Sequence, residues 1–161
     1  VISDPELEEL LTKYGYDAVF YPHFEVQRFL SAFHTENPRV KIGALGQMDV
    51  QTLLMASALL ITDFSSIQFD FAYMLKPEIY YQFDEARYWG THHDRGYFDY
   101  RVDGFGAVVT TQEALLQAIE TALASECAVT PEMQKHIRDT FGALDDHNCE
   151  RNHQAIRELM S

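Results

Sequence analysis

Short apolar runs alternate with amphipathic segments along most of this chain. The runs lie at 18–21, 40–43, 59–62, 78–81 and 107–110. Between them, apolar residues recur at spacings of three and four, as a helix with one buried face requires. Strands that alternate with helices predict a mainly parallel sheet with helices on both faces. The pattern therefore predicts an α/β fold built on such a sheet.

Capping residues, proline and glycine mark where the helices begin and end. Asp4 and Pro5 suit the start of a first helix, and Gly15 suits its end. Thr110 and Glu113 have the spacing of a capping box. We expect helices at 5–14, 24–33, 50–55, 66–74, 113–124, from 131 onward and at 148–160. A polar, aromatic loop is expected at 82–105, and loops of this length are usually functional or mobile.

Length and charge limit the classes of function. A chain of 161 residues suits one domain, here residues 1–161. A formal net charge of −13 argues against binding of nucleic acid, because such binding depends on neutralising phosphates. It does not exclude a small phosphorylated ligand, because a ligand site is local. The two cysteines, Cys127 and Cys149, lack metal-ligand spacing and are expected to be free thiols of a cytosolic protein.

The sequence contains no recognisable signal peptide. The longest apolar run, at 53–61, is too short to span a bilayer. The chain opens with Val1 and leads directly into a helix, so we expect it to be a fragment of a longer protein.

The segment Thr62-Asp63-Phe64-Ser65-Ser66 follows one predicted strand and precedes a predicted helix. Ligands of parallel sheets bind beyond the carboxyl ends of strands. A helix start offers free N–H groups and partial positive charge, and two hydroxyls would add further donors for a phosphate. The alternative is that one serine simply caps the helix. At such a site the Asp63 carboxylate would position the ligand's hydroxyls or a cation. The alternative is that Asp63 caps the helix.

Pro22-His23 occupies the equivalent place after the first predicted strand. Since the carboxyl ends of parallel strands share one edge, we expect His23 to lie near Ser65 and Ser66. An imidazole titrates near neutral pH and so suits general base catalysis. A purely structural role for His23 is the alternative.

The loop at 82–105 holds a third candidate. Arg95 precedes Gly96 and would bring a guanidinium to a phosphate. The neighbouring His92, His93 and Asp94 lack the rigid spacing of metal ligands. We therefore expect no metal and no other cofactor. The loop's aromatic residues are expected to anchor it rather than to stack on a base.

These motifs together resemble the CDP-glycerol glycerophosphotransferase family, the teichoic-acid primases and polymerases. The resemblance rests on four segments, which follow one another along the chain in the same order as in the family. They are "YPHF", "LLITDFSSIQFDFAYMLKP", "DRGYFDY" and "DDHNCER". The resemblance implies a bacterial transferase of cell-wall or capsule biosynthesis that uses a CDP-polyol donor. It implies the C-terminal, donor-binding half of a GT-B fold, which consists of two Rossmann-like domains.

The resemblance also implies roles and partners. His23 matches a histidine implicated in catalysis or in engaging the donor, and Ser65 and Ser66 match residues at the donor phosphates. The implied partners are the N-terminal domain of the same protein and a lipid-linked or glycan acceptor. The implied location is cytoplasmic, or peripheral on the cytoplasmic face of the membrane.

The chain departs from the family pattern in two ways. Phe24 replaces the second proline of the histidine motif, and the strand that precedes this motif in the family is absent. Because this strand is absent, we expect the sheet either to close up or to pair with another chain. The family's N-terminal domain is also missing from the sequence, so we expect the chain to be inactive by itself.

Two other functions fit the same residues. A GT-B sugar-nucleotide glycosyltransferase or epimerase would use the same phosphate turn. A non-catalytic interaction domain on a parallel sheet, of the response-regulator kind, is the alternative outside the enzymes.

Overall fold

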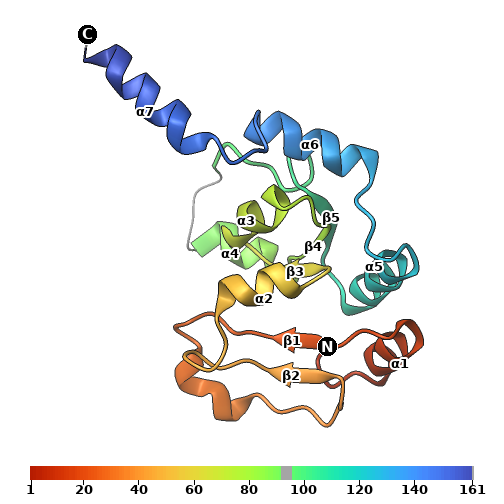
Figure 1. The fold of residues 1–161 in the computed structure, drawn as a ribbon. Helices are drawn as coiled ribbons and strands as arrows, with labels where there is room; N and C mark the ends of the chain where they lie inside the picture. Colours follow the sequence, from red (N-terminus) through yellow and green to blue (C-terminus); the bar gives the residue numbers. More distant parts are fainter. Residues whose placement is uncertain (92–95, 161) are drawn as a thin grey trace.

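The computed structural model describes residues 1–91 and 96–160, and Figure 1 shows its fold. The strands are β1 (Ala18–Phe20), β2 (Val40–Ile42), β3 (Leu60–Thr62), β4 (Glu78–Tyr81) and β5 (Gly106–Val109). The helices are α1 (Pro5–Tyr14), α2 (Val50–Ala56), α3 (Ile67–Tyr73), α4 (Glu85–Thr91), α5 (Gln112–Ala124), α6 (Pro131–Phe141) and α7 (Asn148–Leu159), with a 3-10 helix η1 (Gln27–Ala32). Alternation of strands and helices is confirmed.

The strands form two parallel sheets rather than one. β1 pairs with β2, and β4 lies between β3 and β5 in a second sheet. Every strand pair among the described residues is parallel, as the alternating pattern predicts. The expectation of one continuous sheet is wrong, because no ladder joins β1 to β3 in the part of the chain described here.

Helices cover both faces of the second sheet, as predicted. On one face, Ile79 of β4 packs with Leu115, Leu116 and Ile119 of α5. The leucines of α1 join the same cluster, and α1 packs beside α5. On the other face lies a second cluster. It consists of Ala72 of α3, Phe105 directly before β5, and Ile137 of α6. β4 is therefore the buried centre of the fold.

Local capping chemistry explains several helix ends. Asp4 accepts a hydrogen bond from the backbone of Glu6, and Gly15 ends α1 with φ of 75°. Asp49 and Thr130 cap α2 and α6 through their side chains. The cap of α5 is Thr111, which accepts from the N–H of Ala114, and not Thr110 as expected. Thr110 and Thr111 carry the same hydroxyl group, so which of them caps α5 depends on where β5 ends and α5 begins.

The expected helix at 24–33 is wrong. The structure has turns followed by η1, whose backbone departs from helical geometry at Phe29. Phe24 and Phe29 are 64% and 55% exposed. Leu30 and Phe33 are only half-buried, so the apolar side of this segment is poorly covered, and burial is what stabilises most short helices.

The segment 82–105 is not wholly a loop. It contains α4, which lies beside α3 in Figure 1. Its Tyr88 and Trp89 contact Phe64, so the helix is held by aromatic packing. The prediction that the aromatic residues anchor this segment is confirmed for these two.

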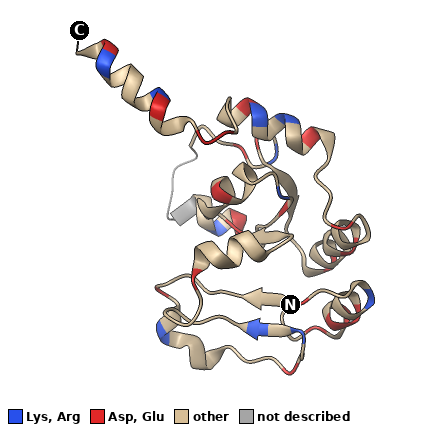
Figure 2. Ribbon diagram, viewed as in Figure 1, with Lys and Arg blue, Asp and Glu red and all other residues tan. Residues whose placement is uncertain are grey.

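Charges are mixed along the surface helices. Figure 2 shows Lys and Arg interspersed with Asp and Glu on α6 and α7. α7 projects from the rest of the fold, and none of its residues is buried. Among the described residues, no helix is long and apolar enough to cross a membrane.

Candidate functional site

The turn between β3 and α3 carries four of the predicted site residues. Thr62 ends β3, and Ser66 stands immediately before the first residue of α3. Ser66 has φ of −66° and ψ of −13°, and its hydroxyl makes no capping hydrogen bond. Ser65 Oγ accepts from the N–H of Ile67 at 3.5 Å, the outer limit for such a bond. Neither serine is thus a firm cap, and Ser66 is an exposed residue.

Aromatic packing fixes this turn. The Phe64 ring stacks on Tyr88 with centroids 3.8 Å apart and planes 5° apart. Tyr100 meets the same ring edge-on at 5.7 Å. Burial is the main cause that raises the pKa of Tyr88 and of Tyr100, and the nearby Asp63 carboxylate adds to both shifts. Phe64 therefore anchors the turn, while Asp63 and Ser66 face solvent.

Two glutamines beside the turn were missed by the sequence analysis. Gln68 lies in the first turn of α3, and Gln82 directly follows β4. They are 2% and 1% exposed, and the Gln68 Oε1 and Gln82 Nε2 atoms lack hydrogen-bond partners among the described residues. Buried polar atoms are normally paired. The sequence offered a signal for Gln82. Its amide follows the apolar run of β4 directly, at the carboxyl end of the strand, where ligands of parallel sheets bind.

His23 follows the carboxyl end of β1 and is exposed. Its Nδ1 accepts from the N–H of Glu25 at 3.4 Å, and its ring lies 4.3 Å from that of Phe24. Gln27 holds the turn: its Nε2 donates to the Pro22 carbonyl at 2.8 Å, and its Oε1 accepts from Leu45 at 3.0 Å. Gln27 thereby ties together the loops that follow β1 and β2.

The structure brings Thr62, Asp63, Ser65 and Ser66 together on one turn. His23 follows a strand of the other sheet, so its proximity to the serines stays a prediction. Arg95, together with His92, His93 and Asp94, lies outside the described residues. Among the described residues, no group of three His, Cys, Asp or Glu side chains is arranged to hold a metal ion.

Lys76, part of the motif that suggested the family, has a structural role. Its Nζ donates to the carbonyls of Leu54, Met55 and Ser57 at 3.0, 2.6 and 2.7 Å. The ammonium also lies 5.3 Å from the Phe71 ring centroid. A cation at these carbonyls satisfies the C-terminal end of α2 and complements its dipole. Lys76 therefore joins the end of α2 to the end of α3.

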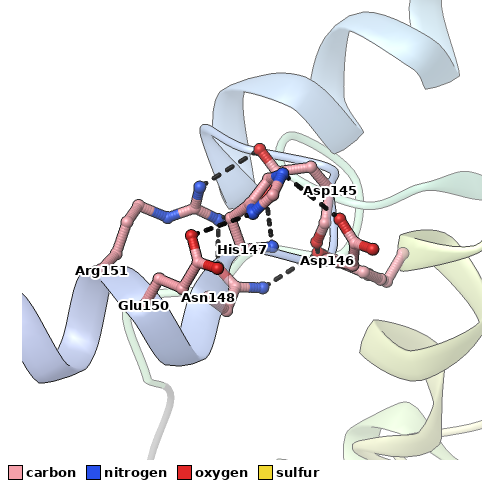
Figure 3. Close-up of polar contacts among 7 residues, drawn as sticks. Asp145, Asp146, His147, Asn148, Glu150 and Arg151 are labelled. Carbon is pink, nitrogen blue, oxygen red and sulfur yellow. Dashed lines mark hydrogen bonds and ion pairs between the residues drawn. The ribbon is translucent and has the colours of Figure 1, made fainter.

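The "DDHNCER" segment forms a polar junction between α6 and α7 (Figure 3). Both terminal nitrogens of Arg151 donate to the Asp145 carboxylate, at 3.1 and 2.8 Å. These bonds are the main cause that lowers the pKa of Asp145 to about 2. Tyr73 of α3 donates to the Asp145 carbonyl at 2.6 Å and accepts from Asn148 at 3.0 Å. The junction therefore fixes the start of α7 against α3.

Fold and turn together define a class of protein. Parallel strands with helices on both faces define a Rossmann-like α/β protein. Ligands of this class bind beyond the carboxyl ends of the strands, and the turn at 62–66 lies at such an end. The sequence profile of the family described as CDP-Glycerol:Poly(glycerophosphate) glycerophosphotransferase matches residues 3–156. The chain belongs to this family, and the resemblance inferred from its motifs is confirmed.

Relatives with described functions match the chain in sequence. The minor teichoic acid biosynthesis protein GgaB of Bacillus subtilis (strain 168) is 31% identical over 159 residues, covering 99% of this chain and 17% of that protein. The teichoic acid glycerol-phosphate transferase of Staphylococcus aureus (strain NCTC 8325 / PS 47) is 36% identical over 72 residues, covering 45% of this chain and 18% of that protein. In each case the matched segment thus covers less than one fifth of the relative's length.

Solved structures match the fold. A structure of the wall teichoic acid polymerase TagF has a TM-score of 0.67 at 20% identity, covering 96% of this chain and 39% of that one. A TagF variant with CDPG has a TM-score of 0.64 at 22% identity, covering 100% of this chain and 40% of that one. The α/β arrangement of parallel strands is therefore shared with TagF.

Proposed function

We propose that this chain is the donor-binding part of a glycerophosphotransferase-like enzyme that uses a CDP-polyol such as CDP-glycerol. The intact enzyme transfers polyol phosphate to a lipid-linked or polymeric glycan of the cell surface. Family membership and the relatives named for teichoic acid synthesis support this proposal. The TagF variant with CDPG supports the choice of donor.

The turn that follows β3 is the observation on which the proposal rests. Ser66 presents a hydroxyl that makes no capping bond, directly before α3. The N–H groups at a helix start and the helix dipole favour an anion there. Ser65 and Ser66 bind the donor phosphates in this proposal, with Thr62 beside them and Asp63 positioning the polyol hydroxyls or a cation. Arg95 adds charge at the pyrophosphate.

The chemistry is a displacement at phosphorus. An acceptor hydroxyl attacks the phosphorus that carries the polyol, a new P–O bond forms, and the bond to CMP breaks. His23 takes the hydroxyl proton or stabilises the developing charge, and CMP leaves with the electrons of the broken bond. His23 suits this role because it is exposed and only one ring nitrogen has a hydrogen bond to a described residue.

The proposal includes an arrangement of the whole protein. Residues 1–161 are one Rossmann-like unit, the C-terminal half of a GT-B fold, with its partner domain elsewhere in the polypeptide. The intact enzyme contacts the membrane only peripherally, at the cytoplasmic face where a CDP-activated donor is available.

A double variant, Ser65→Ala with Ser66→Ala, tests the turn in the intact protein. A hydrogen bond to a charged group contributes about 1.5–3 kcal/mol. CDP-glycerol affinity is therefore expected to fall by at least roughly tenfold, since about 1.4 kcal/mol corresponds to tenfold. The backbone N–H groups remain, so binding weakens without vanishing. Melting temperature is expected to change little, because Ser66 caps nothing.

Thr111→Ala is the matched control. Thr111 is a true cap of α5, so its loss lowers stability by about 0.5–2 kcal/mol without changing donor affinity. Unchanged CDP-glycerol affinity in the double serine variant would refute the phosphate role. A parallel titration with a UDP-sugar separates the polyol donor from a sugar donor, since tighter binding of the UDP-sugar would contradict the proposal.

A further inference from the structure

The aromatic ring in the middle of the turn after β3 is held by two segments that lie later in the sequence. Tyr88 of α4 stacks on Phe64 with ring centroids 3.8 Å apart, and Trp89 of the same helix meets that ring edge-on at 5.6 Å. Tyr100 meets it edge-on at 5.7 Å. Phe64 stands directly before Ser65, so a movement of this ring moves the backbone that carries the two serines.

An ion pair joins the two segments that supply these rings. Both terminal nitrogens of Arg101 donate to the Glu85 carboxylate, at 2.9 and 2.8 Å. Glu85 lies in the first turn of α4, three residues before Tyr88, and residues at this spacing share one side of a helix. Arg101 directly follows Tyr100. The pair therefore joins the segment of Tyr88 to the segment of Tyr100.

The segment that carries Arg101 is fixed by its own hydrogen bonds and by the core. Asp99 Oδ1 accepts from the N–H of Arg101 at 2.8 Å, and Asp103 Oδ2 accepts from the N–H of Asp99 at 2.8 Å. The Tyr100 ring meets the ring of Tyr80 edge-on at 5.1 Å, and Tyr80 is fully buried in β4. Arg101 therefore projects from a segment whose position is set by the centre of the fold.

The position of α4 depends on contacts of this kind. The helix has seven residues, and helices this short are stabilised by tertiary packing rather than by their own hydrogen bonds. Exposed ion pairs usually contribute little to stability, and a guanidinium with two parallel bonds to one carboxylate is the exception. The Glu85 side chain is 24% exposed and that of Arg101 is 50% exposed. The geometry of this pair is therefore suited to holding α4 in place.

We propose that the Glu85–Arg101 ion pair positions the turn after β3 for its phosphate ligand, by way of the Tyr88 ring stacked on Phe64. Neither member of the pair binds the donor, so both are positioning residues. Without the pair α4 shifts, Phe64 loses its stacked partner, and the two serines no longer hold one arrangement. This inference deepens the proposed function and rests on it for the identity of the donor.

Ring variants of the intact protein measure the role of the stack. Tyr88→Leu is expected to weaken CDP-glycerol binding by roughly two- to tenfold, the equivalent of the about 0.5–1.5 kcal/mol that an aromatic pair contributes. Tyr88→Phe keeps the ring and is expected to keep the wild-type affinity. All titrations are run well below the melting temperature of each variant, so that a loss of affinity does not reflect unfolding. Equal affinities of Tyr88→Leu and wild type would contradict the proposal.

Ion-pair variants test whether Arg101 acts through that stack. Arg101→Met is expected to weaken CDP-glycerol binding by no more than Tyr88→Leu does. The double variant is expected to bind no more weakly than Tyr88→Leu alone, because both changes disturb the same contact. Additive losses would contradict the proposal. Lys13→Met is the matched control, since it removes a 2.8 Å ion pair to Glu120 between α1 and α5 and should leave the affinity unchanged.

Amide hydrogen exchange tests the hold on the turn without any ligand. The amides of Gln68 and Phe69 donate to the carbonyls of Ser65 and Ser66 at 3.4 and 3.1 Å, so their exchange rates report how firmly the turn is held. In the unliganded intact protein, both amides are expected to exchange several-fold faster in Arg101→Met than in wild type. In the control variant they are expected to exchange at the wild-type rate.

The two measurements separate failure of this proposal from failure of the proposed function. Equal exchange in wild type and Arg101→Met overturns the proposal, whatever the donor is. Faster exchange with unchanged CDP-glycerol affinity also overturns it. If the wild type binds no CDP-glycerol, the proposed donor is wrong, and faster exchange in Arg101→Met still supports the hold of the pair on the turn. Arg101→Lys, which keeps the charge without the two parallel bonds, takes the place of Arg101→Met if that variant does not fold.

Discussion

A buried carboxyl at the start of β4 makes stability depend on pH. Glu78 is 1% exposed, and neither carboxylate oxygen has a hydrogen bond of ordinary geometry to a described residue. Burial raises the pKa of this carboxyl to about 8, and the nearby Tyr80 hydroxyl and Ala72 backbone offset only part of the shift. The folded protein therefore holds a proton that the unfolded chain releases near its ordinary pKa of 4.5.

The sign of the effect follows from proton binding. Between the unfolded pKa of 4.5 and the folded pKa of about 8, the folded state binds one more proton than the unfolded state. Stability is then lost as pH rises, by about 1.4 kcal/mol per pH unit. From pH 5 to pH 7 the loss is about 3 kcal/mol, which corresponds to a melting temperature lower by roughly 5–11 °C for a chain of this size.

Glu78→Gln removes this titration while it keeps the side-chain shape. Thermal unfolding of both proteins is measured from pH 5 to pH 8. The difference in melting temperature, variant minus wild type, is expected to grow steadily as pH rises. The control is Glu36→Gln, because Glu36 is an exposed loop residue whose change should leave the wild-type curve unaltered. Parallel curves for wild type and Glu78→Gln would refute the reasoning.

Four further changes test other parts of the structure. His23→Ala in the intact enzyme is expected to lower turnover by about a hundred- to ten-thousand-fold with the fold retained, and unchanged kcat would leave His23 a structural role. Gly106→Ala is expected to lower the melting temperature strongly, because its Cβ would lie 1.8 Å from the Glu78 carbonyl oxygen, and a shift no larger than a surface mutation causes would contradict this. Lys76→Met is expected to cost about 1.5–3 kcal/mol in denaturant unfolding, since it leaves three carbonyls at the end of α2 without their cation, and a cost near zero would contradict this. Arg151→Ala is expected to raise the pKa of Asp145 from about 2 toward its ordinary value in a carboxyl NMR titration, with Arg151→Lys giving a smaller rise, and an unmoved pKa would contradict the role of the guanidinium.

Much of the candidate site was predictable because its motif is local. The turn at 62–66 joins a strand and a helix that adjoin in sequence, so its position beyond β3 follows from the βα pattern alone. Gln68 and Gln82 were missed because the burial of an amide, here to 2% and 1% exposure, depends on tertiary packing that a local pattern does not encode. The function of Lys76 was likewise hidden, because its three carbonyl partners lie about twenty residues earlier in the chain.

The sequence by itself determined the helix starts and the strands, because the interactions that define them lie within one helical turn or one strand. Asp4, Asp49 and Thr130 begin helices because each side chain bonds to a backbone N–H two or three residues later. The apolar runs determined the strands, and alternation with helices determined that they would be parallel. Tertiary structure decided whether the segment at 24–33 found a surface to pack on, and it decided that the strands form two sheets. The physical reason is that a strand satisfies its backbone groups only on another strand, so the pairing of an edge depends on which distant segment is present to meet it.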